Sequence, residues 1–227
     1  MTVIEVTSLP EIQPVVFDLY RDIHKGLRGE LFALTASAGQ TDPSDAESRA
    51  DLARHVDSVV SLLVSHAHHE DAAIEPVLER YLPDLAERIE TDHVALDRRI
   101  AAVADMAKTA IDAPAGARRF ELHRVYLELS AFVSAYLAHI DLEERYVGPA
   151  LEQVVGVEGV VAIHGSIIAS LTPEEMATKF SEHKGRFGTG SFIWFPEGEV
   201  MSHGATAEAD VTVLLVSNKA FSIKYES

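Results

Sequence analysis

Two stretches of this sequence place a histidine four residues before a glutamate. His66 precedes Glu70, and His139 precedes Glu143. In an α-helix this spacing puts the imidazole and the carboxylate one turn apart on the same face. Imidazole nitrogens bind iron, zinc, copper and nickel, and carboxylate oxygens also suit harder cations. The two pairs are therefore candidate ligands of a metal site.

The two pairs belong to a longer pattern that occurs twice. Each glutamate is followed six residues later by a proline, Pro76 or Pro149, and then by x-Leu-Glu. A lone histidine also comes before each pair: His24 lies 42 residues before the first, and His93 lies 46 residues before the second. This internal repeat indicates two related halves that place their ligands in the same way.

All of these histidines and glutamates fall on the apolar stripe of an expected helix. A single histidine in such a place is usually a hydrogen-bonded core residue, and a single His-x3-Glu pair is common on helix surfaces. Four histidines and two glutamates facing one core, however, would be costly to bury without a cation. Two carboxylates from different helices can also bridge two ions. The predicted metal ligands are His24, His66, Glu70, His93, His139 and Glu143.

Helical periodicity predicts the elements that must position these ligands. Apolar residues recur at helical spacing over 11–39, from about 44 to 80, from 83 to a break at 113–116, and over 117–153. A shorter helix is expected over 157–170. Four long helices joined by short turns predict a mainly α protein, an up-down-up-down four-helix bundle.

Composition limits the class of protein. The 227 residues suffice for one substantial domain and a small second one. The formal net charge of −17 argues against nucleic acid and anionic membranes as partners. The absence of cysteine excludes disulfides, zinc–thiolate sites and iron–sulfur clusters. We see no signal peptide, and no apolar run that approaches the roughly 20 residues of a membrane span, so we expect a cytoplasmic protein.

The histidine and glutamate pattern over residues 11–175 resembles the hemerythrin-like, HHE cation-binding family. The resemblance implies two non-haem iron ions with a bridging oxo or hydroxo group, and zinc or manganese are the alternative metals. It also implies binding of dioxygen, hydrogen peroxide or nitric oxide. Two functions stay open: a di-iron protein that reacts with a small oxidant, for example an enzyme with catalase-like activity, or a non-catalytic iron, oxygen or redox sensor.

The sequence departs from the oxygen-carrying members of that family at one position. Those members use a fifth histidine, from a His-x3-His pair on the third helix. Here the residues four positions from His93 are Ile89, which cannot bind a metal, and Asp97, which could. One of the two iron ions is therefore expected to have weaker nitrogen ligation or an open coordination position. The departure favours peroxide or nitric oxide chemistry, or sensing, over reversible oxygen carriage.

Four further residues are candidates for supporting roles at the site. Tyr20 and Tyr136 lie three or four residues before a predicted ligand, so each is either a hydrogen-bonding or redox-active tyrosine or an ordinary core aromatic. His69 is a candidate additional ligand. Glu144 either orients a ligand by a hydrogen bond or is a solvated helix charge.

The composition of the sequence changes after the helical region, where glycines and β-branched and aromatic residues become frequent. We place the boundary between a metal-binding bundle, 1–175, and a small β-rich tail, 176–227. Residues 190–198 resemble the second half of a cupin barrel, but His203 comes two residues late and the first half of a cupin is absent. A second metal at His183 and His203 is the weaker alternative. Because a few strands are marginal alone, we expect the tail to pack on the bundle or to pair two chains into a homodimer.

Overall fold

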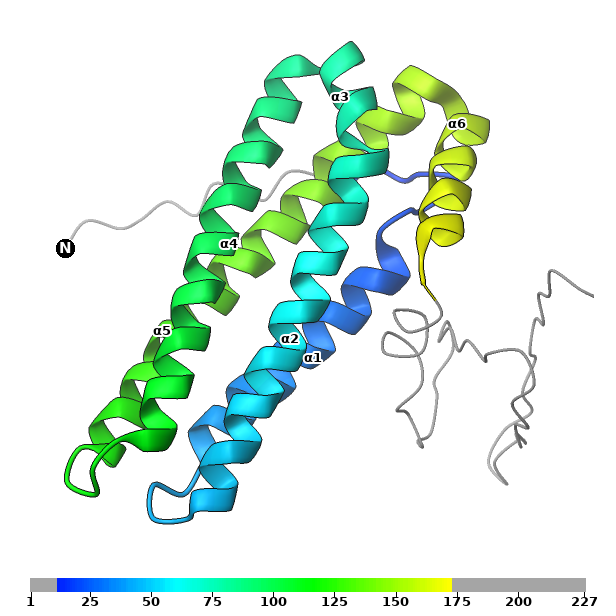
Figure 1. Cartoon of the computed structure of the whole chain (residues 1–227). Helices are drawn as coiled ribbons and strands as arrows, with labels where there is room; N and C mark the ends of the chain where they lie inside the picture. Colours follow the sequence, from blue (N-terminus) through cyan, green and yellow to red (C-terminus); the bar gives the residue numbers. More distant parts are fainter. Residues whose placement is uncertain (1–11, 173–227) are drawn as a thin grey trace, which may run out of the picture.

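The structure, a computed structural model, describes residues 12–172 of the chain. Figure 1 shows four long helices side by side as an up-down-up-down bundle, in which α1 contacts α2 and α5, and α4 contacts α2 and α5. The predicted mainly α bundle is therefore confirmed. The elements are α1 (Arg21–Gln40), α2 (Ala46–Ala73), α3 (Glu75–Tyr81), α4 (Pro83–Asp112), α5 (Arg118–Leu142), the π-helical turn η1 (Glu143–Val147) and α6 (Gly148–Ser170).

The predictions for the tail fall outside this range. The β-rich segment expected at 176–227, its cupin-like part and the alternative metal pair His183 and His203 all lie outside the described residues. The division into two domains at 175 therefore stays a prediction.

The first helix begins ten residues later than the periodicity predicted. The Asp18 carboxylate accepts hydrogen bonds from the backbone N–H groups of Tyr20, at 3.2 Å, and Arg21, at 3.0 Å, and so caps the helix start. Just upstream, the backbone N–H of Val16 donates to the Glu152 carboxylate at 2.9 Å. This contact holds the incoming chain against α6 in a non-helical conformation.

The second helix is interrupted, where we expected it to run to about residue 80. It ends at Ala73, and α3 begins at Glu75 with Pro76 in its first turn. Proline has no N–H to donate and clashes with the preceding turn, so the helix cannot pass straight through this position.

The related proline of the second half has a different effect. At Pro149 the chain stays helical, but η1 precedes it, with the Gly148 N–H bonded to the Glu143 carbonyl five residues back. A π-helical turn of this kind adds one residue to the turn and often occurs at functional sites. The single helix expected over 117–153 is thus divided into α5, η1 and the first part of α6.

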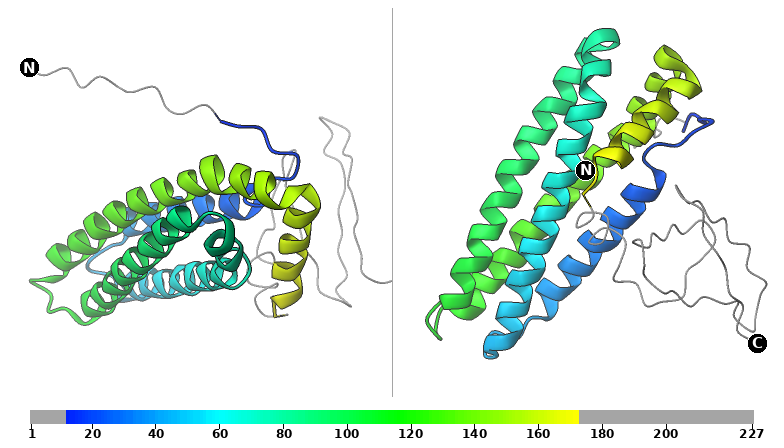
Figure 2. Two further views of the ribbon diagram at one scale, coloured as in Figure 1. Left: turned by 90° about the horizontal axis from the view of Figure 1, so that it is seen from above. Right: turned by 45° about the vertical axis from the view of Figure 1, so that its right-hand side comes forward.

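A kink at Gly156 then separates the two parts of α6. Its φ of 72° is left-handed, a conformation that glycine adopts without steric cost. The helix expected over 157–170 follows as the second part of α6. Figure 2 shows α6 turned back beside the end of the bundle.

Two apolar clusters make up the core, and the predicted ligands lie between them. Along α1, Tyr20 belongs to one cluster and Leu27 to the other, with His24 between. Along α4, Ile89 and Leu96 flank His93 in the same manner. The helices therefore cross a polar layer between two apolar ones, which positions the site inside the bundle.

Candidate metal centre

All six predicted ligands converge in this polar layer. They come from α1 (His24), α2 (His66 and Glu70), α4 (His93), α5 (His139) and η1 (Glu143), and each is buried. The structure thus brings together every member of the set, whereas their ligation of a metal stays a prediction.

Glu143 lies between histidines of three helices. Its Oε2 lies 3.5 Å from Nε2 of His24. Its Oε1 lies 3.3 Å from Nε2 of His139 and 3.8 Å from Nε2 of His93. One oxygen of this carboxylate therefore faces the His24 side of the site and the other faces the His93 side.

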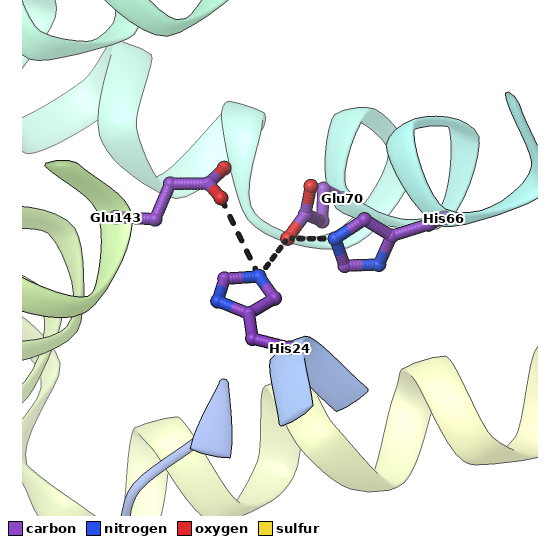
Figure 3. A group of neighbouring side chains, drawn as sticks. All are labelled: His24, His66, Glu70 and Glu143. Atoms are coloured by element: carbon purple, nitrogen blue, oxygen red, sulfur yellow. Dashed lines mark ion pairs between the residues drawn. The ribbon is translucent and has the colours of Figure 1, made fainter. Parts of the chain in front are cut away.

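Glu70 has the same relation to the two sides. Its Oε1 lies 3.3 Å from Nε2 of His66 and 4.0 Å from Nε2 of His24, and Figure 3 shows both contacts. Its Oε2 lies 3.7 Å from Nε2 of His93. Both carboxylates consequently offer one oxygen to the pair His24 and His66, and the other to the side of His93.

The donor atoms are spaced as ligands of metal ions would be. One group of four residues and one of three each offer ligand atoms within 4.8 Å of one another, with Glu143 common to both. Around one ion at about 2.0–2.2 Å per bond, ligand atoms lie roughly 3.0–4.4 Å apart. The measured 3.3–4.0 Å fits this range. The groups are His24, His66, Glu70 and Glu143, and His93, His139 and Glu143.

Some of these donors also lack the hydrogen bonds that burial normally requires. Nε2 of His24, Nε2 of His93 and Oε2 of Glu143 are buried without a hydrogen-bond partner among residues 12–172. Buried polar atoms are almost always satisfied. A bound cation would satisfy all three atoms, so the residues present fit a metal.

Two outer carboxylates orient the imidazoles. Nδ1 of His24 lies 3.1 Å from Oε1 of Glu144, whose two oxygens also accept from Arg28 at 2.7 and 2.8 Å. Nδ1 of His93 lies 2.7 Å from Oδ1 of Asp71. When Nδ1–H donates to a carboxylate, Nε2 keeps its lone pair for the centre, and the ring orientation is fixed.

Of the two roles left open for Glu144, the structure shows the hydrogen bond to His24, whereas Asp71 was not among the candidates. The signal for Asp71 was present in the repeat, because an acidic residue directly follows each glutamate of the centre.

Glu143 and Glu144 stay ionised despite their burial. Burial alone would raise the pKa of Glu143, but the nearby imidazoles of His139 and His93 outweigh burial and lower it. Burial likewise opposes ionisation of Glu144, yet His24 and Arg28 lower its pKa to about 2. Both side chains are therefore carboxylates at neutral pH.

Comparison with known families bears on this site directly. The model of the hemerythrin HHE cation binding domain matches residues 15–151. The chain belongs to this family. The matched range includes all six candidate ligands of the HHE domain and both outer carboxylates. No curated protein and no solved structure matches the chain.

The two tyrosines predicted near the HHE centre do lie against it. The Tyr20 ring stacks on His24 with 4.8 Å between centroids, and the Tyr136 ring meets the His139 ring edge-on at 5.9 Å. Burial first, and then the nearby Glu143 and Glu70 charges, raise both phenol pKa values well above the usual one. Both tyrosines are therefore neutral.

The remaining candidates lie outside the two groups of donors. Asp97 is exposed and borders a small hollow beside His93 and Tyr136. His69 is buried, but its Nδ1 lies 3.1 Å from the Ser170 hydroxyl, at the contact of α2 with α6. Neither is grouped with the donors of the centre among the described residues.

Proposed function

We propose that this HHE domain holds two iron ions and that the centre binds or reacts with dioxygen, hydrogen peroxide or nitric oxide. The observation that carries the proposal is the position of Glu70 and Glu143, each of which directs one oxygen to either side of the centre. Two carboxylates so placed suit a pair of cations that share them. One ion would lie with His24 and His66, and the other with His93 and His139.

Charge balance supports this assignment. The imidazoles are neutral donors, so Glu70 and Glu143 supply two negative charges against the four positive charges of two divalent ions. The excess favours small anionic or polarisable ligands from solution. Nitrogen and oxygen donors of this mixture suit iron, while zinc and manganese are the metals that analysis must exclude.

The surroundings of His93 suit a small uncharged molecule. Two small hollows border this residue, one lined in part by Tyr20 and Ile89 and the other by Leu96 and Tyr136. The exposed surface of both hollows is mainly apolar, although four carboxylate side chains also line the first. Each side of the centre receives two imidazole nitrogens and two carboxylate oxygens, so coordination positions are left for such a molecule.

The chain's own residues hold and shield this centre. Asp71 and Glu144 fix the imidazoles of His93 and His24, and the buried Tyr20 and Tyr136 rings close the layer toward the apolar clusters. Iron, when bound, would supply the redox change that these side chains cannot.

The alternative function, a non-catalytic iron, oxygen or redox sensor, is favoured by the place of Glu143 in the chain. Glu143 lies in η1, which continues directly into α6. A change in the position of this carboxylate would therefore act on α6, which turns away from the bundle axis.

Peroxide consumption separates the two functions. Iron-loaded protein should consume hydrogen peroxide faster than the same concentration of free iron, and the His66→Gln variant should lose the excess. The His68→Gln variant, which changes an exposed histidine on the same helix, is the matched control and should keep it. Consumption no faster than that of free iron would favour the sensor, and zinc or manganese in protein purified from cells would contradict iron.

A further inference from the structure

The second part of α6 has an apolar face that the described residues leave open. Glu158 is its one charged side chain between 157 and 170, and Val160 its one buried residue. Val161 is 45% exposed and Ile168 is 39% exposed. By length and composition alone, the helical run Arg118–Ser170 even contains a stretch that could cross a membrane.

The inner face of the same helix is already occupied. Val160 belongs to the apolar cluster at this end of the bundle, and Ile163 and Ile167 pack against that cluster. Val161 and Ile168 are seven residues apart, so they share one face, which lies about 100° around the helix from Val160 and Ile167 and which we call the outer face. Figure 2 shows α6 beside the end of the bundle, where one side of the helix is turned away from the other helices. The described part of the bundle therefore leaves this face uncovered.

We propose that residues 173–227 of the same chain cover this outer face of α6. The segment begins directly after the structure ends, next to the last turn of the helix. It contains the apolar runs 192–195 and 211–216, which require burial of their own.

Residues 173–227 are long enough to span the second part of α6. Residues 157–170 form about 21 Å of helix at 1.5 Å per residue. An extended chain covers that distance in about six or seven residues.

The size of the face favours the chain's own segment over a second copy. A helix about 21 Å long and about 10 Å wide offers roughly 200 Å² on one side. A stable interface between two proteins takes roughly 800 Å² from each. A tethered segment avoids most of this requirement, because the tether gives it a high effective concentration.

Single cysteines test the proposal, since the natural chain contains none. Val161→Cys and Ile168→Cys place a thiol on the outer face, and Leu127→Cys places one on α5 at a leucine that is 51% exposed. The rate of maleimide labelling is measured on the full-length protein in lipid-free buffer, relative to the rate in denaturant. The described residues alone predict similar rates at the three positions. We expect labelling at least tenfold slower at 161 and 168 than at 127.

A charge on the face should reverse this protection. Adding Val161→Glu to Ile168→Cys should restore labelling to the rate at 127, because a buried carboxylate would expel the apolar segment. Adding Leu127→Glu instead is the control and should leave residue 168 protected.

Three results would overturn the proposal. Equal labelling at all three positions would show that nothing covers the face. Protection that rises with protein concentration would identify a second copy as the occupant. Protection that requires phosphatidylcholine or phosphatidylglycerol vesicles would identify a membrane. The assay needs no metal, so its outcome is independent of the proposed iron chemistry.

Discussion

At the scale of single residues, the centre is organised by two acidic pairs. In each half of the repeat a glutamate faces the centre and the next residue faces away from it. Asp71, which follows Glu70, holds His93, and Glu144, which follows Glu143, holds His24. Each half therefore orients the histidine contributed by the other half.

Replacing Asp71 by Asn should weaken metal binding without unfolding the protein. The neutral amide lacks the charge that fixes the Nδ1–H of His93, and losing such an outer partner typically weakens metal affinity about 10–100-fold. Competition with a chelator measures the change. Asp105→Asn removes an exposed acid from α4, the helix of His93, and is the control. Equal affinities of the two variants would contradict a role for Asp71.

The sequence predicted the centre well because periodicity reports directly on helix faces. All six candidate ligands could be placed on apolar stripes, and the structure brings their side chains together. Asp71 was missed because an acid beside a ligand resembles any solvated helix charge until its partner, 22 residues away, is known.

At the scale of elements, the two halves of the sequence repeat have different backbone structures at their equivalent prolines. Pro76 ends α2, whereas Pro149 lies just after η1 in a helix that continues. The hydrogen-bonding register of a helix is not visible in the pattern of apolar residues, so neither the break nor the π-helical turn could be predicted. The late start of α1 depends likewise on a contact with Glu152, far along the chain.

The kink in α6 supplies a test at this scale. Gly156→Ala should destabilise the protein by about 1–2 kcal/mol, because an L-residue is strained at a φ of 72°. Gly29→Ala, in α1, has open space around the new methyl group. It should instead stabilise by about 0.5–1 kcal/mol. Urea unfolding measures both, and a loss of stability at 29 or none at 156 would contradict the assigned conformations.

At the scale of the whole molecule, the buried arginine Arg49 links two segments at the end of the bundle opposite α6. The Arg49 guanidinium donates to the Pro43 carbonyl at 2.7 Å and to the Ile111 carbonyl at 3.4 Å. It thereby joins the turn before α2 to the end of α4, far from the metal centre.

Arg49→Met should lower the free energy of unfolding by about 1–3 kcal/mol, because it leaves two partly buried carbonyl groups without the donors that they have now. Arg54→Met, at an exposed position of the same helix, should change stability by less than about 0.5 kcal/mol. Urea unfolding gives both values, and metal content should be the same in the two variants. Reduced metal content in Arg49→Met alone would show that this end of the bundle is coupled to the centre.

Metal should stabilise the whole bundle, since four helices and η1 contribute candidate ligands. A ligand that binds only the folded state raises its stability in proportion to RT ln(1 + [L]/Kd), about 2.7 kcal/mol at a hundredfold excess over Kd. Removal of the metal by a chelator should therefore lower the melting temperature by several degrees. The comparison is made on one preparation before and after reloading with iron. An unchanged melting temperature would contradict a metal site that joins the helices.

The most direct test of the proposed centre is the iron content of four proteins purified in parallel: the natural chain, Glu70→Gln, Glu143→Gln and His68→Gln. A centre bridged by both carboxylates predicts two iron ions per chain in the natural protein and in the His68 control. It predicts a loss of iron in each glutamine variant, because either substitution removes a negative charge and replaces one of the two carboxylate oxygens by an amide NH2 group, so that side chain can no longer bridge two ions. Two iron ions retained in both glutamine variants would contradict the proposed ligands.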